Sequence, residues 1–381
     1  MNKKILLALS CWLSINGAYS ADEIGLNTEN VLDINAIAQG FEFDFHRVVQ
    51  REQLPGGAFV IVSPDEVVKL GTAGYRAVGQ TDLITADTVF RLASVSKTFT
   101  SALTAKLVED GKLTWKDSVD VYEPGFRLQD NVIITLQDLL GQTTGIVGHA
   151  WDQLIEENWL PETILPKFSE LTSVCQPGTC YTYQNVAFSL VEPAINQVTQ
   201  KNYAANLKQQ IFEPLRMEQA SVGLAALEAN DNVARPHKKS NDQWQEVEVL
   251  PTYYRISPAA GVNASIIDLA RWLQAQMGAS PSVISDSLVN TVSHARIATP
   301  QALRRRFWRD HLTDAHYGLG WRIYQWGDET LIYHGGFVMG YRSEIAYSSK
   351  HKIGFALLLH SEGSSASELI TDFWERVFNE P

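Results

Sequence analysis

Apolar stretches of strand length occur near both ends of the chain. Close to the N-terminal end, residues 57–62 and 66–70 are separated by Ser63-Pro64-Asp65, a turn signal that predicts a hairpin. Towards the C-terminal end, further strands are expected at residues 320–324, 330–333, 343–347 and 353–359. The pattern therefore predicts one sheet to which both ends of the chain contribute.

Helical spacing of apolar residues dominates the middle of the chain. Helices are expected at residues 95–109, 135–140, 186–199, 203–212 and 266–277, with one more at 365–378. This order predicts an α/β fold with a discontinuous α/β lobe over residues 35–110 and 316–381, and a mostly helical lobe inserted over residues 111–315. With 381 residues, 45% of them hydrophobic, the chain has enough apolar material for a large core.

The first residues have the organisation of a signal peptide. Asn2-Lys3-Lys4 supplies charge, an apolar stretch runs from Ile5 to Ile15, and Ala18-Tyr19-Ser20 precedes an expected cut after Ser20, so that residues 1–20 would be removed. A membrane anchor is the alternative, but the apolar stretch is shorter than the roughly 20 residues that a spanning helix needs. A lipoprotein signal at Cys11 is a poor match. We expect a periplasmic or secreted protein without a membrane span.

Charge and cysteine content narrow the possible partners. The formal net charge of −12 argues against nucleic acid and anionic lipid surfaces. The basic run at residues 304–309 is expected to be a solvated helix face or loop, with a rim contact for an anionic substrate as the alternative. Cys175 and Cys180 flank a Pro177-Gly178 turn, which predicts a disulfide in an oxidising compartment; two free thiols are the alternative.

Ser94-Val95-Ser96-Lys97 is the first of three segments that can carry chemistry. It follows an extended stretch and opens a long apolar helix, so Ser94 falls at the helix start and Lys97 one turn later on the same face. A serine beside a desolvated amine can lose its proton during attack, and amide N–H groups at a helix start favour developing negative charge. Alone, the pattern also fits a helix cap and a surface lysine.

Two later segments complete the set. Tyr183 and Asn185 stand two apart before an apolar helix and project to the same side, where a phenol can shuttle a proton and an amide can hold Lys97. His334-Gly335-Gly336 follows an apolar strand, and its glycines remove side chains where another backbone comes close. A substrate could then lie along this strand, with the Phe337 and Ser94 N–H groups as an oxyanion hole. Aromatic packing and a tight bend are the alternatives.

In this order and separation, the three segments resemble the serine β-lactamase and D-alanyl-D-alanine peptidase superfamily. The resemblance points to the branch of class C β-lactamases, DD-peptidases, D-aminopeptidases and family VIII esterases, and it runs from about Gly56 to the end of the chain. Supporting segments are Phe90–Lys97, Gly111–Leu113, Ile134–Leu136, Thr143–Ile146, Ile211–Leu215 and Tyr317–Trp321.

The resemblance implies an antiparallel sheet flanked by helices, with the site in the cleft between this layer and the helical lobe. Ser94 would form the acyl-enzyme, while Lys97 and Tyr183 would carry protons. Asn185 would orient Lys97 and the substrate amide, and His334 would stand where many relatives place lysine. The implied substrate is a β-lactam, a D-amino-acid peptide or a small ester, and neither a metal nor another cofactor is implied. The oligomeric state stays open.

Two departures from the family pattern bear on the substrate. Gln184 stands where a small residue is usual, which predicts a narrower floor. His334-Gly335-Gly336 replaces Lys-Thr-Gly, exchanging a fixed cation for one that titrates and removing a hydroxyl that binds a carboxylate. Arg342 can restore a carboxylate anchor, although a surface arginine is the alternative. We expect modest turnover of β-lactams, and better handling of carboxylates as the pH falls towards about 6.5.

Two other functions remain open. A relative that is acylated and deacylates slowly would serve as a penicillin-binding sensor. A structural envelope protein would keep the fold without the chemistry, but the intact set of Ser94, Lys97, Tyr183 and Asn185 weighs against it.

Overall fold

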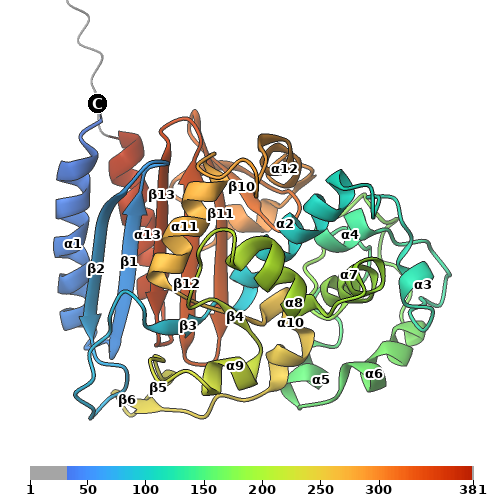
Figure 1. Cartoon of the computed structure of the whole chain (residues 1–381), viewed down its shortest axis with the longest axis horizontal. Coiled ribbons are helices and arrows are strands. Elements are labelled where there is room, and N and C mark those ends of the chain that lie inside the picture. The colour runs from blue at the N-terminus through green and yellow to red at the C-terminus, as the bar shows by residue number, and fades with distance from the viewer. Residues whose placement is uncertain (1–31, 380–381) are drawn as a thin grey trace, which may run out of the picture. The chain divides into compact units, whose positions relative to one another are not determined.

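An eight-stranded antiparallel sheet is the largest element of the computed structural model, which describes residues 32–379 (Figure 1). Its order is β2-β1-β13-β12-β11-β10-β9-β8. The strands are β1 (Gly56–Val62), β2 (Val67–Gly74), β8 (Ile297–Ala298), β9 (Leu312–Tyr317), β10 (Arg322–Trp326), β11 (Glu329–Val338), β12 (Tyr341–Ser348) and β13 (Ile353–Leu359). Because β1 pairs with β13, the prediction of one sheet built from both ends of the chain is confirmed.

The remaining elements are helices and two small sheets. The small sheets are β3-β7-β4, formed by Val89–Arg91, Val262–Ser265 and Ser221–Val222, and β5-β6, formed by His237–Ser240 and Gln243–Glu246. The α-helices are α1 (Ile34–Arg51), α2 (Ser96–Glu109), α3 (Val119–Tyr122), α4 (Leu136–Leu140), α5 (Asp152–Glu156), α6 (Pro161–Ile164), α7 (Val191–Thr199), α8 (Tyr203–Leu207), α9 (Leu224–Glu228), α10 (Ser257–Ala260), α11 (Ile266–Gln276), α12 (Asp286–Val292) and α13 (Ser365–Asn379). Short 3₁₀ turns include η1 (Ala93–Val95), η3 (Ala187–Leu190) and η6 (Pro300–Arg304).

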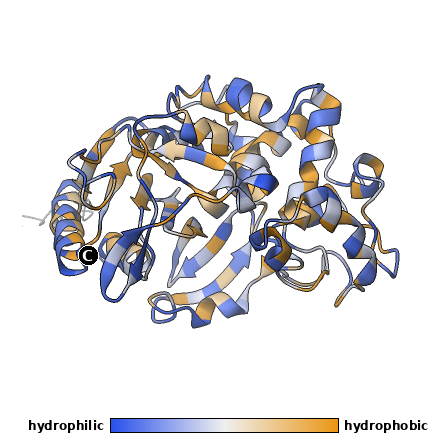
Figure 2. Ribbon diagram, turned by 90° about the horizontal axis from the view of Figure 1, so that it is seen from below, coloured by the Kyte–Doolittle hydropathy of each residue, from blue (hydrophilic) through white to orange (hydrophobic). Residues whose placement is uncertain are grey.

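Helices cover both faces of the large sheet. On one face, Phe41 of α1 contacts Phe59 of β1 and Phe355 of β13, with ring centroids 4.9 and 5.0 Å apart. On the other face, Leu273 of α11 packs over Gly354, and successive strand residues point to opposite sides. Figure 2 shows hydrophobic and hydrophilic segments alternating along the helical ribbons, as one-sided burial requires.

Helix α2 is buried along most of its length, from Ser96 to Ala105. Its Phe99 ring stacks on Trp272 of α11 at 4.2 Å, which ties α2 to a helix that itself packs on the sheet. Its threonine hydroxyls are satisfied locally; Thr104 Oγ1, for example, donates to the Thr100 carbonyl at 2.8 Å. The first turn of α2, which carries Lys97, is therefore held firmly, and Ser94 lies just before it in η1.

Most predicted elements lie within a few residues of the observed ones, with local differences. The helix expected at 186–199 begins as the 3₁₀ turn η3, and the one expected at 203–212 ends in a π-helical turn over Lys208–Phe212. Strands β8 and β9 were not predicted. The division into two lobes stays a prediction, and α11, from the middle segment, packs on the sheet.

The N-terminal leader lies outside the described residues, so the signal peptide at 1–20 stays a prediction. Between residues 32 and 379, no helix is both long and apolar enough to cross a membrane.

Candidate active site

A cavity of about 720 Å³ opens at Ser94 and joins segments far apart in the sequence. The predicted site residues that line it are Ser94, Tyr183, Asn185, Gly335, Gly336, Phe337 and Arg342. Lys97 and His334 are fully buried behind its walls. The three sequence segments are thus brought to one place by the fold.

Ser94 lies in a tight turn between β3 and α2. Ala93, just before it, has a φ of +48°, a left-handed conformation that costs a non-glycine residue about 1 kcal/mol or more. Neighbouring strands hold the turn: the Leu92 N–H donates to the Val262 carbonyl at 3.0 Å, and Ser343 Oγ donates to the Leu92 carbonyl at 2.6 Å. Strain that is held in this way next to a cavity is typical of functional positions.

Gly336 of β11 lies against the Ser94 turn. A Cβ at this position would come within 2.2 Å of the Leu92 carbonyl oxygen, so the backbone approach that the glycines predicted is present here. At Gly335 the close neighbours are instead the side chains of Glu344 and Tyr333. On one side of β11, strand β10 pairs only with residues 329–333. On the other side, the pairing of β11 with β12 continues to Val338 of β11. The edge of β11 beyond Tyr333 is therefore not paired with β10 and lies against the Ser94 turn.

The Lys97 amine is buried beside the Ser94 hydroxyl, with Nζ 3.3 Å from Oγ. Nζ also donates to Asn185 Oδ1 at 2.7 Å and to the Ala259 carbonyl at 3.0 Å. Burial is the main cause that lowers the pKa of Lys97 to about 7. Such an amine is partly neutral near neutral pH and can accept the serine proton.

Tyr183 lines the cavity together with Ser94. Its ring centre lies 4.8 Å from Lys97 Nζ. Burial raises the pKa of Tyr183 to about 12, so the phenol keeps its proton at neutral pH. Lys97 is therefore the group whose charge changes in the neutral range, and Tyr183 is placed as a proton donor.

Asp152, the first residue of α5, is a buried carboxylate that the sequence analysis missed. Its Oδ2 accepts a hydrogen bond from Asn185 Nδ2 at 2.7 Å and lies 2.8 Å from His149 Nδ1. Its Oδ1 is buried and has no hydrogen-bond partner among residues 32–379. No motif marks Asp152, because it lies 33 residues before Asn185 and only the fold joins them.

Arg322, the first residue of β10, was also missed. Its Nη1 donates to Tyr181 OH at 3.4 Å, and its Cζ lies 5.5 Å from the ring centre of Tyr183 and 5.7 Å from that of Tyr317. Only a strand was predicted for this segment. The structure adds a guanidinium group that lines the cavity next to the catalytic candidates.

His334 has a different setting from the one expected. Its Nε2 lies 3.2 Å from Tyr317 OH and its Nδ1 lies 3.0 Å from the Gly335 carbonyl oxygen. Burial, followed by the positive charges of Arg322 and Lys97, holds the pKa of His334 well below its ordinary value. The carbonyl can only accept, so Nδ1 carries the proton and Nε2 accepts from the phenol. The expected attraction of a carboxylate by protonated His334 is therefore not supported.

Gln184 points away from the cavity. Its Nε2 donates to the Ile146 carbonyl at 3.1 Å and to the Val147 carbonyl at 2.6 Å, and its own carbonyl accepts from Gln142 Nε2. Gln184 therefore braces the Tyr183–Asn185 segment from behind, and the narrowing of the floor expected from it is not observed.

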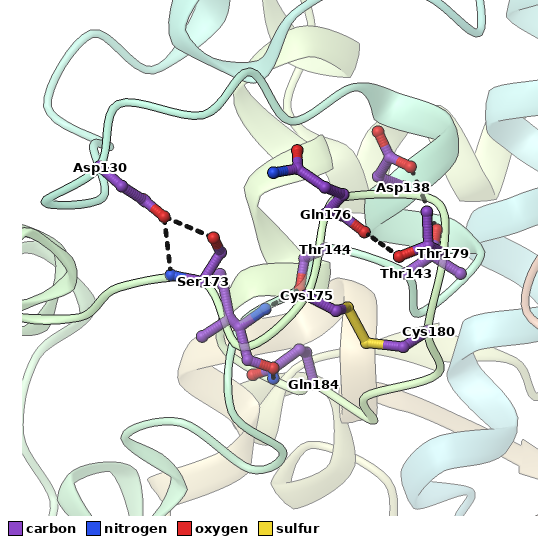
Figure 3. Close-up of a disulfide and its surroundings, with 11 residues drawn as sticks. Asp130, Asp138, Thr143, Thr144, Ser173, Cys175, Gln176, Thr179, Cys180 and Gln184 are labelled. Carbon is purple, nitrogen blue, oxygen red and sulfur yellow. Dashed lines mark hydrogen bonds between the residues drawn. A yellow bond between two sulfur atoms is a disulfide. The ribbon is translucent and has the colours of Figure 1, made fainter.

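The predicted disulfide joins Cys175 and Cys180, whose Cα atoms are 6.3 Å apart (Figure 3). The loop between them docks on the turn after α4, where the Gly178 N–H donates to the Thr143 carbonyl at 2.8 Å. Because Tyr183 follows Cys180 closely in the chain, the docked loop helps to set where the phenol enters the cavity.

The sheet side of the cavity is rich in arginine. Arg305, Arg322 and Arg342 all line it, so the expectation that the basic run at 304–309 is solvated is wrong for Arg305. Arg342 Cζ lies 4.4 Å above the ring centre of Phe337, which is 51% exposed. Glu344 lines the same side, and burial raises the pKa of its carboxyl. This wall offers cationic groups to a substrate.

The antiparallel sheet with its flanking helices, together with the Ser94–Lys97 pair, is typical of the β-lactamase-like class of proteins. The chain belongs to the Beta-lactamase family, whose model matches residues 41–376.

Relatives with curated descriptions are distant in sequence. The chain is 25% identical over 341 residues to an unguisins hydrolase of Aspergillus campestris, a match that covers 85% of this chain and 62% of that protein. It is 23% identical over 350 residues to protein flp of Staphylococcus aureus, a match that covers 87% of this chain and 64% of that protein. The chain thus spans less than two thirds of the length of these relatives.

Solved structures agree on the fold. The octameric penicillin-binding protein homologue from Pyrococcus abyssi superimposes with a TM-score of 0.79 at 25% identity, covering 90% of this chain and 77% of that one. EstCE1, a hydrolase with promiscuous acyltransferase activity, superimposes with a TM-score of 0.76 at 14% identity, covering 91% of this chain and 100% of that one. This second likeness is one of fold alone.

Proposed function

We propose that this chain is an exported serine hydrolase that forms an acyl-enzyme on Ser94 with an amide or ester of a small molecule or peptide. The observation that carries the proposal is the buried Lys97 amine, 3.3 Å from Ser94 Oγ and held by Asn185 Oδ1 at 2.7 Å. The named relatives and neighbours include hydrolases and a penicillin-binding protein homologue, which supports acyl transfer.

In the proposed acylation, Ser94 Oγ attacks the substrate carbonyl carbon. The hydroxyl proton passes to Lys97 Nζ, and the carbonyl electron pair moves to the oxygen, for which the Ser94 and Phe337 N–H groups are the proposed donors. When the tetrahedral intermediate collapses, the bond to the leaving group breaks and Tyr183 protonates that group. Lys97 then returns a proton to Tyr183, so the proton count balances.

Deacylation reverses the roles with water. A water molecule loses a proton to the Lys97–Tyr183 pair as it attacks the acyl carbon, and the proton returns to Ser94 Oγ when the ester bond breaks. The role proposed for Asn185 is to hold the Lys97 amine through both steps. His334 has no proton-transfer step in this scheme, because its two ring nitrogens are hydrogen-bonded to Tyr317 OH and to the Gly335 carbonyl.

The substrate class follows from the third segment. In place of a lysine and a threonine hydroxyl, the strand presents a neutral His334 and two glycines, so the carboxylate anchor falls to Arg342. We expect modest turnover of most β-lactams beside appreciable hydrolysis of small uncharged esters. D-Amino-acid peptides are the third class of acyl donor in this proposal.

Export is supported by the Cys175–Cys180 disulfide, because disulfides persist in oxidising compartments such as the periplasm. The intact mass of the protein recovered from outside the cytoplasm tests this part. A mass that begins at Ala21 is expected, and a full-length mass would contradict the cut after Ser20.

Intact-mass spectrometry after mixing with a penicillin and, separately, with a short-chain nitrophenyl ester tests the chemistry. We expect a transient acyl adduct that is absent in Ser94→Ala. An equal labelled fraction in Ser94→Ala would contradict the assignment of the nucleophile. A Ser94-dependent adduct that persists without turnover would favour the slowly deacylating penicillin-binding sensor instead.

A further inference from the structure

A line of hydrogen-bonded side chains leads from the protein surface to the proposed base. His149 has an exposed side chain, and its Nδ1 lies 2.8 Å from Asp152 Oδ2. The same oxygen accepts from Asn185 Nδ2 at 2.7 Å, and Asn185 Oδ1 accepts from Lys97 Nζ at 2.7 Å. Asp152 and Asn185 are both buried. The carboxylate is thus one amide group away from the amine.

The Asn185 amide can serve Lys97 in only one of its two orientations. Its Oδ1 must face the lysine, because the amide nitrogen offers only donors and Lys97 also donates. Asp152 Oδ2 accepts from the amide nitrogen and so selects this orientation. A neutral acceptor could do the same, so orientation alone does not require a charge at position 152.

The charge of Asp152 has a separate effect on the amine. Burial lowers the pKa of Lys97 most, the Asp152 carboxylate raises it, and Arg322 lowers it further. The other titratable groups facing Lys97 are Tyr183, which keeps its proton, and His334, which stays neutral. Asp152 is therefore the negative charge that offsets burial and the Arg322 guanidinium.

We propose that Asp152 is a positioning residue of the acylation reaction: through Asn185 it orients the Lys97 amine, and its charge sets the pH range in which that amine can take the Ser94 proton. The inference rests on the proposed function, since it concerns the base of that reaction. His149, at the surface end of the line, is hydrogen-bonded to the Asp152 carboxylate and lines the same cavity.

The test is the pH profile of acylation by a short-chain nitrophenyl ester, followed as adduct formation in the full chain from about pH 5 to about pH 9, a range that brackets a perturbed amine. The rate should fall on the acid side as Lys97 becomes protonated. Asp152→Asn removes the charge that raises the pKa of Lys97, so this acidic limb should move to lower pH by about one unit. A purely structural role would lower the rate at every pH without moving the limb.

Glu156→Gln is the matched control. Glu156 lies on the same helix and lines the same cavity, but its Oε1 accepts from Tyr253 OH at 2.7 Å and it makes no hydrogen bond to Asn185. The acidic limb of the pH–rate profile of Glu156→Gln should lie at the same pH as that of the wild type. An equal shift in both variants would overturn the proposal, because the effect would then belong to the general charge of the wall.

Asp152→Glu keeps the test decisive if the neutral variant does not fold. A carboxylate displaced by one methylene should hold the limb within about half a pH unit of the wild type while lowering the plateau rate. If the acidic limb of Asp152→Glu moved to lower pH by as much as the limb expected for Asp152→Asn, the proposal would be overturned. Loss of Ser94-dependent labelling in the wild type would instead refute the proposed function, so the two failures are distinguishable.

Discussion

The two walls of the cavity are built on different principles. On the helical side, Lys97, Asn185 and Asp152 are buried and joined by hydrogen bonds of 2.7 Å, and a titratable amine lies at the centre. On the sheet side, the strand edge after Tyr333 presents glycine backbone, with Arg305, Arg322 and Arg342 around it. In the proposed mechanism, proton transfer therefore belongs to the helical wall and substrate recognition to the sheet wall.

His334 shows why this separation holds. His334 is fully buried and hydrogen-bonded to Tyr317 OH and to the carbonyl of its own neighbour Gly335. Burial, and then the charges of Arg322 and Lys97, lower the pKa of His334, so its ring is neutral. A charge there would raise the cost of protonating Lys97 further.

Loss of the amine should give the largest effect on the helical wall. Lys97→Met keeps the length of the side chain and removes the base, so acylation by a nitrophenyl ester should slow by about 10²–10⁴-fold, the usual span for general base catalysis. Stopped-flow release of nitrophenolate measures the rate, and a circular dichroism melt confirms that the variant is folded. A near-normal rate would contradict this comparison, because a group other than Lys97 would then be the general base.

Removal of a cation from the sheet wall should affect binding instead. Arg342→Ala should raise KM for carboxylate-bearing substrates about tenfold and leave kcat and the esters nearly unchanged, because a group that binds ground and transition states alike does not alter the chemical step. Arg309, which lies in the basic run but outside the cavity lining, provides the control Arg309→Ala. A fall in kcat with unchanged KM would place Arg342 in the chemistry.

The disulfide loop should have a smaller effect, confined to the placement of Tyr183. A bridge over so short a loop contributes about 2 kcal/mol, and Gly178 still docks on Thr143 without it. Cys175→Ser combined with Cys180→Ser should reduce turnover by about tenfold at most, with only a small drop in Tm. Unaltered kinetics with a clearly lower Tm would leave the bridge as a structural staple.

The smallest expected effect is that of pH on the preference for carboxylate-bearing over uncharged substrates. Because the pKa of His334 lies well below its ordinary value, the ring stays neutral from about pH 8 down to about pH 6, through the reference value of a free imidazole. The ratio of kcat/KM for carboxylate-bearing and uncharged substrates should therefore be flat across that range. A ratio that grows as the pH falls would show that His334 is protonated and would restore its ionic role.

The local sequence pattern predicted which helices and strands form better than it predicted the residues at which they begin and end. Alternating and apolar runs marked β1, β2 and β13 because buried strands need continuous hydrophobic faces. Strand β9 was missed because Leu312–Tyr317 mixes polar and aromatic residues, and only its pairing with β10 selects a strand. Helix α8 continues into a π-helical turn for which the sequence carries no signal.

The sequence by itself predicted the candidate catalytic residues, because three short segments in one order resemble a known family. Ser94 and Lys97 are one helical turn apart, and Tyr183 and Asn185 share a short segment, so local spacing suffices to group them. Tertiary structure alone decided which charges surround these groups. Asp152 and Arg322 come from separate elements and carry no local signal, whereas Arg305 belongs to the basic run for which a rim contact was the alternative prediction. Only packing determined that His334 is buried and neutral. Burial depends on everything that surrounds a side chain, and no short sequence pattern encodes that neighbourhood.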